Sequence, residues 1–464
     1  MTETWATFGA DLHLDLTRGR GLRAGLAEAL RDAARTGRLA AGTRLPSSRT
    51  LAADLGIARN TVAEAYAELV AEGWLTARHG SGTRVAERAR PRRAAAAARV
   101  RPPVHGRPAH SLVPGTPDLG GFPRAAWSAA ARRALATAPN EAFGYGSDGR
   151  GRIELREALA GYLARARGVY ADPERIVLTA GFAHALAVTA AVVRARRVRE
   201  MAVEGYGLDI HRDLLARAGL RTRPLCVDAQ GARTGDLAAA AGAVLLTPAH
   251  QFPTGVALTP GRRAAAVDWA RTTGGLVLED DYDGEFRYDR QSVGALQGLD
   301  PDRVVYLGTA SKSLAPGLRM GWMVVPPGLM GEVLAAKGAT DRSSSALDQL
   351  TLAEFITSGA YDRHVRGMRL RYRRRRDELV AAVAGRAAVS GIAAGLHAVL
   401  DLPPGTERSV VQSAAWQDLA LEGMSRYRHP QAGLPPRDAL VVGYGTPPDS
   451  SWTPTLEALT AALP

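Results

Sequence analysis

Lys312 is the residue of this sequence with the most distinctive chemistry. It lies in a run that surrounds one lysine with hydroxyl groups, glycines and an arginine: Gly308-Thr309-Ala310-Ser311-Lys312-Ser313-Leu314-Ala315-Pro316-Gly317-Leu318-Arg319-Met320-Gly321. Lysine occurs only at positions 312 and 337 although the chain has 59 Lys plus Arg, so arginine fills almost every other basic position. A primary amine forms a Schiff base with an aldehyde, and a guanidinium cannot. Lys312 is therefore predicted to supply a required amine; a surface lysine without a role is the alternative.

Other polar clusters follow short apolar runs, which are predicted to be buried parallel strands of an α/β sheet. The runs are Val177-Leu178, Met201 to Val203, Ala243 to Leu246, Leu276 to Leu278 and Val304 to Leu307. Ligands bind beyond the ends of such strands. The clusters that follow are Thr179-Ala180-Gly181-Phe182-Ala183, whose helix start offers N–H groups to a phosphate, His250-Gln251-Phe252-Pro253-Thr254-Gly255, and Glu279-Asp280-Asp281-Tyr282-Asp283. Each cluster alone is also compatible with a capped helix or a turn.

The elements of residues 10–86 predict a separate small module. Leu22, Leu26, Leu30 and Ala33 have helical spacing before Gly37, which predicts an amphipathic helix that packs on the elements that follow. Two shorter helices are expected between Pro46 and Gly56 and between Arg59 and Gly73. Two short helices across a tight turn indicate a helix-turn-helix. Trp74-Leu75-Thr76 and Arg84-Val85 then flank His79-Gly80-Ser81-Gly82 as a β-hairpin, the wing.

This module resembles the winged-helix DNA-binding domain of the GntR family. The resemblance is carried by Leu45-Pro46-Ser47-Ser48-Arg49, Leu51-Ala52, Leu55-Gly56, Arg59, Thr61-Val62, Ala65-Tyr66, Leu69 and Glu72-Gly73-Trp74-Leu75. It implies that Arg49 and Arg59 contact operator DNA, that Asn60 and Thr61 lie near bases or phosphates, and that His79 and Gly80 place the wing in the minor groove. Ala58 departs from the Ser or Thr that usually caps the recognition helix.

Composition supports a DNA-binding, multidomain protein. The net charge is +13, and residues 1–108 hold 18 Arg against 10 Asp plus Glu, so +8 of this charge lies on the side of the module. Residues 87–110 form a basic linker rich in Pro and Ala. The single cysteine, Cys226, excludes an intrachain disulfide, and neither a signal peptide nor a membrane span is found. The expected location is the cytoplasm.

Residues 111–464 resemble the fold-type I pyridoxal phosphate (PLP) aminotransferases, which have a mainly parallel central sheet and a smaller α+β domain. The resemblance implies a Schiff base at Lys312, Asp280 at the pyridinium nitrogen and Tyr282 at the phenolate oxygen. It assigns the phosphate to Gly181, Phe182, Ala183, Thr309, Ser311 and Arg319, with Tyr145 from the partner of a homodimer, and it makes Tyr206 the residue that stacks on the ring. The larger part is expected at about residues 145–340, and the small domain at about 111–140 plus 345–464. The basic helix from Arg363 to Val380 is expected to lead into the small domain; a second DNA site is the alternative.

The combination of a GntR-type head with an aminotransferase-like body resembles the MocR subfamily of transcriptional regulators. Two departures from aminotransferases bear on the ligand. Phe252 occupies the usual position of an Asn that donates to the phenolate, and Val441 aligns with the Arg that binds a substrate carboxylate; Arg426, Arg428 or Arg437 are possible replacements. We expect a regulator that senses PLP itself, in control of vitamin B6 supply, or an amino compound. The alternatives are a working aminotransferase with a DNA-binding head and a DNA-binding scaffold that has lost its cofactor.

Overall fold

The structure is a computed structural model, and it describes residues 21–78, 82–87, 108–144, 148–288, 293–339, 344–433 and 436–464. The chain forms two compact units, residues 1–105 and 106–464. No helix within these described ranges is long and apolar enough to cross a membrane.

The first unit is a winged helix-turn-helix, as predicted. It consists of α1 (Leu22–Arg35), α2 (Ser48–Leu55), α3 (Arg59–Ala71) and the antiparallel pair β1 (Leu75–Arg78) and β2 (Gly82–Val85). The Ser47 hydroxyl caps α2 by accepting a hydrogen bond from the Thr50 amide at 3.1 Å, and Gly56 ends the helix at φ 67°. Leu26, Leu30 and Leu69 are buried together, whereas Leu22 is 55% exposed and lies outside the core that its spacing predicted.

The second unit is organised around a seven-stranded sheet in the order β4-β12-β11-β10-β9-β5-β6, in which only β12 runs antiparallel to its neighbours. Its strands are β4 (Ile176–Thr179), β5 (Glu200–Glu204), β6 (Arg221–Leu225), β9 (Ala243–Leu246), β10 (Leu276–Asp281), β11 (Val304–Thr309) and β12 (Gly321–Val324). All five predicted strands are present. The fold is the expected mainly parallel α/β sheet.

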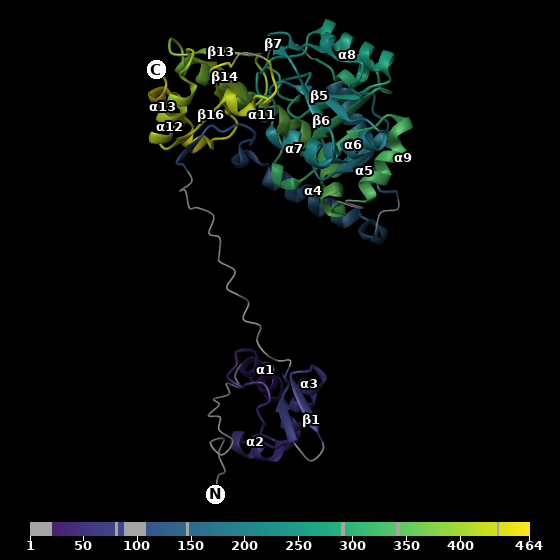
Figure 1. The fold of residues 1–464 in the computed structure, drawn as a ribbon, viewed down its shortest axis with the longest axis vertical. Helices are drawn as coiled ribbons and strands as arrows, with labels where there is room; N and C mark the ends of the chain where they lie inside the picture. The colour runs from purple at the N-terminus through teal and green to yellow at the C-terminus, as the bar shows by residue number, and fades with distance from the viewer. Residues whose placement is uncertain are drawn as a thin grey trace. The chain divides into compact units, whose positions relative to one another are not determined.

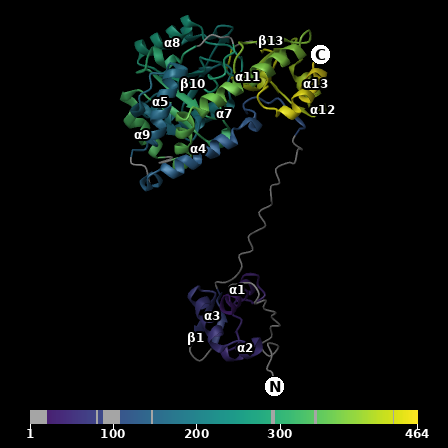
Figure 2. The same cartoon turned by 180° about the vertical axis from the view of Figure 1, so that it is seen from behind.

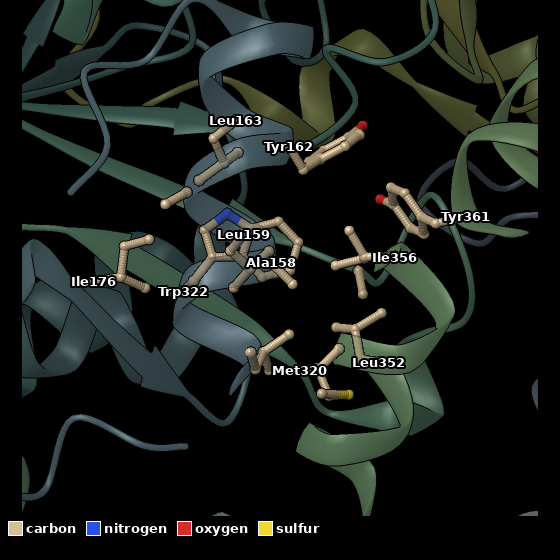
Figure 3. Packing of buried hydrophobic residues seen from close by; sticks show 14 of the residues in the cluster. Ala158, Leu159, Tyr162, Leu163, Ile176, Met320, Trp322, Leu352, Ile356 and Tyr361 are labelled. Carbon is tan, nitrogen blue, oxygen red and sulfur yellow. The ribbon is translucent and has the colours of Figure 1, made fainter. Parts of the chain in front are cut away.

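Helices cover both faces of this sheet, which explains the uninterrupted apolar runs within its central strands. One face packs against α5 (Ile153–Arg167) and α8 (Pro260–Thr273), and the other against α6 (Phe182–Ala195), α7 (Asp209–Arg217) and α9 (Met330–Gly338). Figures 1 and 2 show these helices from opposite sides of the unit. Figure 3 shows the first face, where Leu159 of α5 packs beside Trp322 of β12 and the rings of Tyr162 and Tyr361 meet edge to face at 4.9 Å.

The smaller part of the second unit is an antiparallel sheet in the order β13-β14-β17-β16. Its strands are β13 (Ala388–Ser390), β14 (Ala398–Asp401), β16 (Glu422–Gly423) and β17 (Ala439–Val442), with α12 (Glu407–Trp416) and α13 (Trp452–Ala462) beside them. β3 (His110–Ser111) pairs with β15 (Leu419–Ala420), so the start of the unit joins this part. The other α-helices and strands of this unit are α4 (Arg124–Thr137), β7 (Val227–Asp228), β8 (Gly231–Ala232), α10 (Ala346–Thr357) and α11 (Ala360–Ala382).

The basic helix α11 is anchored by its predicted apolar stripe, because Val365, Met368, Tyr372 and Leu379 are all buried. One of its arginines is buried as well. Arg375 is 0% exposed and pairs with Asp118 at 3.2 Å and Asp449 at 2.6 Å. The helix is therefore a structural connection into the smaller part, and Arg375 belongs to its core.

Candidate cofactor cavity and DNA-binding face

A cavity of about 220 Å³ opens at the carboxyl ends of β5, β9, β10 and β11. This edge of the sheet is where ligands bind in parallel α/β folds. The cavity brings together nine of the residues predicted to bind the cofactor: Phe182, Ala183, Tyr206, Asp280, Tyr282, Thr309, Ser311, Lys312 and Arg319. Gly181 adjoins them, since a Cβ at this position would lie 3.4 Å from Nη1 of Arg319. Tyr145 lies outside the described residues.

Lys312 follows β11 and places its amine on the cavity wall, where Nζ donates a hydrogen bond to the Gly115 carbonyl. Burial lowers the pKa of this amine, and the negative charges of Asp283 and Asp280 oppose the shift. A lower pKa increases the share of neutral amine, which is the nucleophilic form. Lys312 thus has the environment of a reactive lysine.

Asp280 is separated from its acidic neighbours by the alternation of side chains along β10. Glu279 accepts hydrogen bonds from the Leu296 and Gln297 amides at 2.7 and 2.8 Å, and Asp281 pairs with Arg167 at 2.7 Å, both beneath the opposite face of the sheet. Asp280 alone faces the cavity. Its Oδ1 is buried with no hydrogen-bond partner among the described residues, and burial together with Asp281 raises the carboxyl pKa well above its usual range.

The Tyr282 hydroxyl lies 3.2 Å from Nδ1 of His250, and the same nitrogen lies 2.9 Å from Oδ2 of Asp283. Burial raises the pKa of Tyr282 well above its usual range, so its hydroxyl keeps its proton. His250, Asp283 and His397 bring possible metal ligands within 4.8 Å of one another. However, the two imidazole rings face each other at 4.7 Å, and Nε2 of His397 is hydrogen-bonded to the Pro253 carbonyl at 3.2 Å. We therefore assign His250 and Asp283 to a hydrogen-bonded support for Tyr282, with the His397 ring packed against His250.

The opposite end of the cavity is suited to a phosphate. α6 begins at Phe182 with no side-chain cap, so the first N–H groups of the helix are available to an anion. Arg319 adopts φ 51° and its Nη2 donates to the Ala180 carbonyl at 2.7 Å. The Thr309 and Ser311 hydroxyls lie 2.8 Å apart beside it. These groups form a positively polarised cradle.

The remaining wall is largely apolar. Tyr206 is 4% exposed and packs in a cluster with Val399, Met424, Tyr427, Ala439 and Val441. Val441 is 0% exposed, so an apolar cluster occupies the position predicted to have lost a carboxylate-binding arginine. Arg426 pairs with Glu422 at 3.1 Å and Arg437 with Asp401 at 2.5 Å, while Arg428 donates to the Ala432 carbonyl. None of these three arginines lines the cavity.

The groups in the cavity fit pyridoxal phosphate, and the unpartnered Asp280 oxygen is the most specific observation. A protonated pyridine nitrogen would give this buried carboxylate the donor that the protein does not supply. Lys312 would attach the aldehyde carbon, Tyr282 would donate to the ring hydroxyl, and the cradle at Arg319 would hold the phosphate. When bound, the cofactor supplies an electron sink for chemistry at an amine carbon.

Four ionisable residues that line the cavity were not among the predicted site residues: Glu204, His211, Arg212 and His397. Burial raises the pKa of Glu204 to about 7, and its Oε2 accepts from the Thr247 hydroxyl at 2.5 Å. Burial lowers the pKa of His211 to about 4, so this imidazole is neutral near pH 7. Glu204 follows an apolar run, which is a signal of a strand end. Arg212 and His211 lie on a helix with no motif that marks them.

In the winged helix-turn-helix unit, some arginines are ion-paired and others are exposed without an ion-pair partner among the described residues. Arg31 pairs with Glu72 at 2.8 Å and Arg38 with Asp32 at 3.0 Å, whereas Arg49 and Arg59 are exposed at the starts of α2 and α3 and have no ion-pair partner among the described residues. Exposed cations at helix starts suit DNA phosphates and major-groove bases. Asn60 is exposed and Thr61 half-buried on the first turn of α3. His79 and Gly80 of the predicted wing lie outside the described residues.

Comparison with protein families matches each unit to a known model. Residues 22–85 match the gntR family of bacterial regulatory proteins. Residues 116–431 match aminotransferase class I and II.

Relatives and solved structures agree with these matches. The chain is 32% identical to the HTH-type pyridoxine biosynthesis transcriptional regulator PdxR of Corynebacterium glutamicum over 91% of both chains. It is 33% identical to the probable rhizopine catabolism regulatory protein MocR of Rhizobium meliloti over 77% of this chain and 76% of that protein. The crystal structure of an archaeal alanine:glyoxylate aminotransferase matches with a TM-score of 0.68 and 24% identity, covering 76% of this chain and 89% of that one, which shows a shared fold.

Proposed function

This chain belongs to the GntR family of bacterial regulators, in the MocR subfamily that carries an aminotransferase-like domain, and we propose that PLP bound at Lys312 controls its binding to operator DNA. The observation that carries the proposal is the cavity of the second unit. There a reactive lysine, a buried carboxylate oxygen without a partner and an anion cradle line one space. A DNA-binding head and a cofactor cavity in one chain suit a ligand-controlled regulator.

DNA recognition is assigned to the head. Arg49, Arg59, Asn60 and Thr61 form its DNA-facing surface, with His79 and Gly80 in the wing. A homodimer would present two such heads to two half-sites. Tyr145 would then reach the phosphate of the partner's cofactor.

PLP itself is the favoured signal. Val441 and Phe252 replace polar groups with which aminotransferases bind and process an amino acid, which disfavours rapid turnover. The name of the relative PdxR refers to the regulation of pyridoxine biosynthesis. A role in vitamin B6 supply follows for this chain as a proposal.

The first test is covalent attachment at Lys312. Purified protein is incubated with PLP and reduced with borohydride, and its peptides are analysed by mass spectrometry. Because the chain has only two lysines, at 312 and 337, the modified position is unambiguous. We expect pyridoxyl label on Lys312, and none in Lys312→Arg, which keeps the positive charge but cannot form the bond. Label on Lys337 alone, or no label on wild-type protein, would refute the assignment.

A further inference from the structure

The cavity contains a second arginine in addition to Arg319. Arg212 of α7 lines it from the side of the 205–208 loop, whereas Arg319 lies beside Gly181 at the start of α6. The proposed function gives Arg319 to the cofactor phosphate. Arg212 has no role in that arrangement.

Arg212 is held by backbone carbonyl groups. Its Nη1 donates to the Gly207 carbonyl at 2.8 Å and approaches the Tyr427 carbonyl at 3.5 Å. Burial lowers the pKa of the Arg212 guanidinium, and the negative charges of Asp209 and Asp213 on the same helix oppose this shift. Neither carboxylate lies within ion-pair distance of Arg212 in the part of the chain that the structure describes. Instead, Asp209 lies 3.9 Å from Arg426. Within the described part of the chain, Nε and Nη2 of Arg212 have no partner. A guanidinium oriented in this way can bind an anion with two parallel hydrogen bonds.

Several apolar side chains line the cavity that Arg212 and Lys312 share. The Phe252 ring lies 5.0 Å from the Tyr427 ring, whose backbone contacts Arg212, and 6.3 Å from the Tyr282 ring. Leu208 and Leu396 also line the cavity. His211, the neighbour of Arg212, is neutral near pH 7, so of these two side chains only Arg212 offers a positive charge to an anion. A ligand that fits would have an anionic group, a short apolar body and an amine.

We propose that Arg212 binds the carboxylate of an amino acid that enters the PLP-loaded cavity with its amino group towards Lys312. This inference rests on the proposed function, because it requires PLP at Lys312, and it adds a second input to the same site. Arg212 of α7 would then take the role of the carboxylate-binding arginine that Val441 replaces. Val441 of the smaller part, which lies in an apolar cluster, has no role in this recognition.

Isothermal titration calorimetry on the PLP-loaded full-length protein tests this assignment. The probes are three amino acids and the amines that remain when their carboxylate is removed: β-alanine with ethylamine, γ-aminobutyrate with propylamine, and L-norvaline with butylamine. For at least one pair, we expect the acid to bind about tenfold more tightly, equivalent to roughly 1.4 kcal/mol. Arg212→Gln should abolish this preference and leave amine binding unchanged, and Arg212→Lys should retain part of it.

Arg217→Gln is the matched control, because Arg217 is exposed on the same helix and does not line the cavity. It should behave as wild type. The visible absorption of bound PLP reports whether each variant is folded and loaded. Equal binding of acid and amine to wild type, or a preference that survives in Arg212→Gln, would overturn this inference alone. A wild-type protein without Lys312-dependent PLP absorption would overturn the proposed function, and this inference with it.

Discussion

Asp280→Asn should make the PLP-free protein more stable and the PLP complex weaker. Oδ1 of Asp280 is buried without a partner, and burial penalises its charge. An unsatisfied buried group typically costs about 1–3 kcal/mol, and more when it is charged. Asparagine has nearly the same shape and no charge, so the free energy of unfolding without PLP should rise by about 1 kcal/mol.

When PLP is bound, the same substitution should be unfavourable. Hydrogen bonds to charged groups contribute about 1.5–3 kcal/mol, so losing the contact between Asp280 and the ring nitrogen should weaken PLP binding roughly 10-fold to 150-fold. The stabilisation that saturating PLP provides should fall by the same free energy, since it follows the ratio of ligand concentration to Kd. Thermal unfolding with and without PLP, together with a fluorescence titration of PLP, measures both effects.

Asp281→Asn is the control from the opposite face of the same strand. Its carboxylate pairs with the buried Arg167 at 2.7 Å, and breaking such a pair typically costs about 3–5 kcal/mol. This variant should lose stability with and without PLP and keep its PLP affinity. The reasoning fails if Asp280→Asn destabilises the PLP-free protein as Asp281→Asn does, or if its PLP affinity equals that of wild type.

Two further outcomes follow from the structure. Burial and the charge of Asp281 raise the pKa of Glu285 to about 7 from its ordinary value of 4.5. The folded protein therefore holds this proton more tightly than the unfolded chain, and the associated stability is present below pH 4.5 and lost as the pH rises to about 7. In denaturant unfolding, the stability of Glu285→Gln relative to wild type should rise by up to about 3 kcal/mol across this interval, and parallel pH profiles of the two proteins would contradict this. Ala58 gives α3 no side-chain cap, so Ala58→Ser should raise the melting temperature of a fragment spanning residues 1–105 by an amount equivalent to about 0.5–2 kcal/mol. Ala58→Gly should fall short of Ala58→Ser by only about a few tenths of a kcal/mol, because glycine is nearly as favourable as serine at a helix start. An unchanged melting temperature in Ala58→Ser would show that other groups already satisfy the start of α3.

Local sequence signals were sufficient to predict the helices of the winged helix-turn-helix unit and the strands of the large sheet. Ser47 before α2, Gly56 after it and the spacing of Leu26 and Leu30 are short-range features, and the structure has the elements they predict. The prediction that Leu22 packs with the other leucines of this helix was wrong, because helical spacing alone does not show where the packed face of a helix ends. It lies at the first residue of α1 and is 55% exposed.

Long-range contacts account for what the sequence did not predict. The buried environment of Arg375 depends on Asp118 and Asp449, which are remote in the chain, so a basic run gave no sign of it. Arg212 is oriented by carbonyl groups of Gly207 and Tyr427, and its place in the cavity follows from tertiary packing. By contrast, alternation along β10 separates Asp280 from Glu279 and Asp281 once the strand and its buried faces are known.

The most direct test of the central claim is a DNA-binding titration on the region upstream of the protein's own gene, at stated salt, with PLP-free and PLP-loaded protein side by side. A ligand shifts an equilibrium only by its differential affinity for the two states. We expect specific binding whose affinity changes by at least about tenfold, or roughly 1.4 kcal/mol, on loading with PLP, and no such change in Lys312→Ala. Specific binding that is identical with and without PLP would contradict PLP control, and an absence of specific binding would contradict the assignment of the chain as an operator-binding regulator.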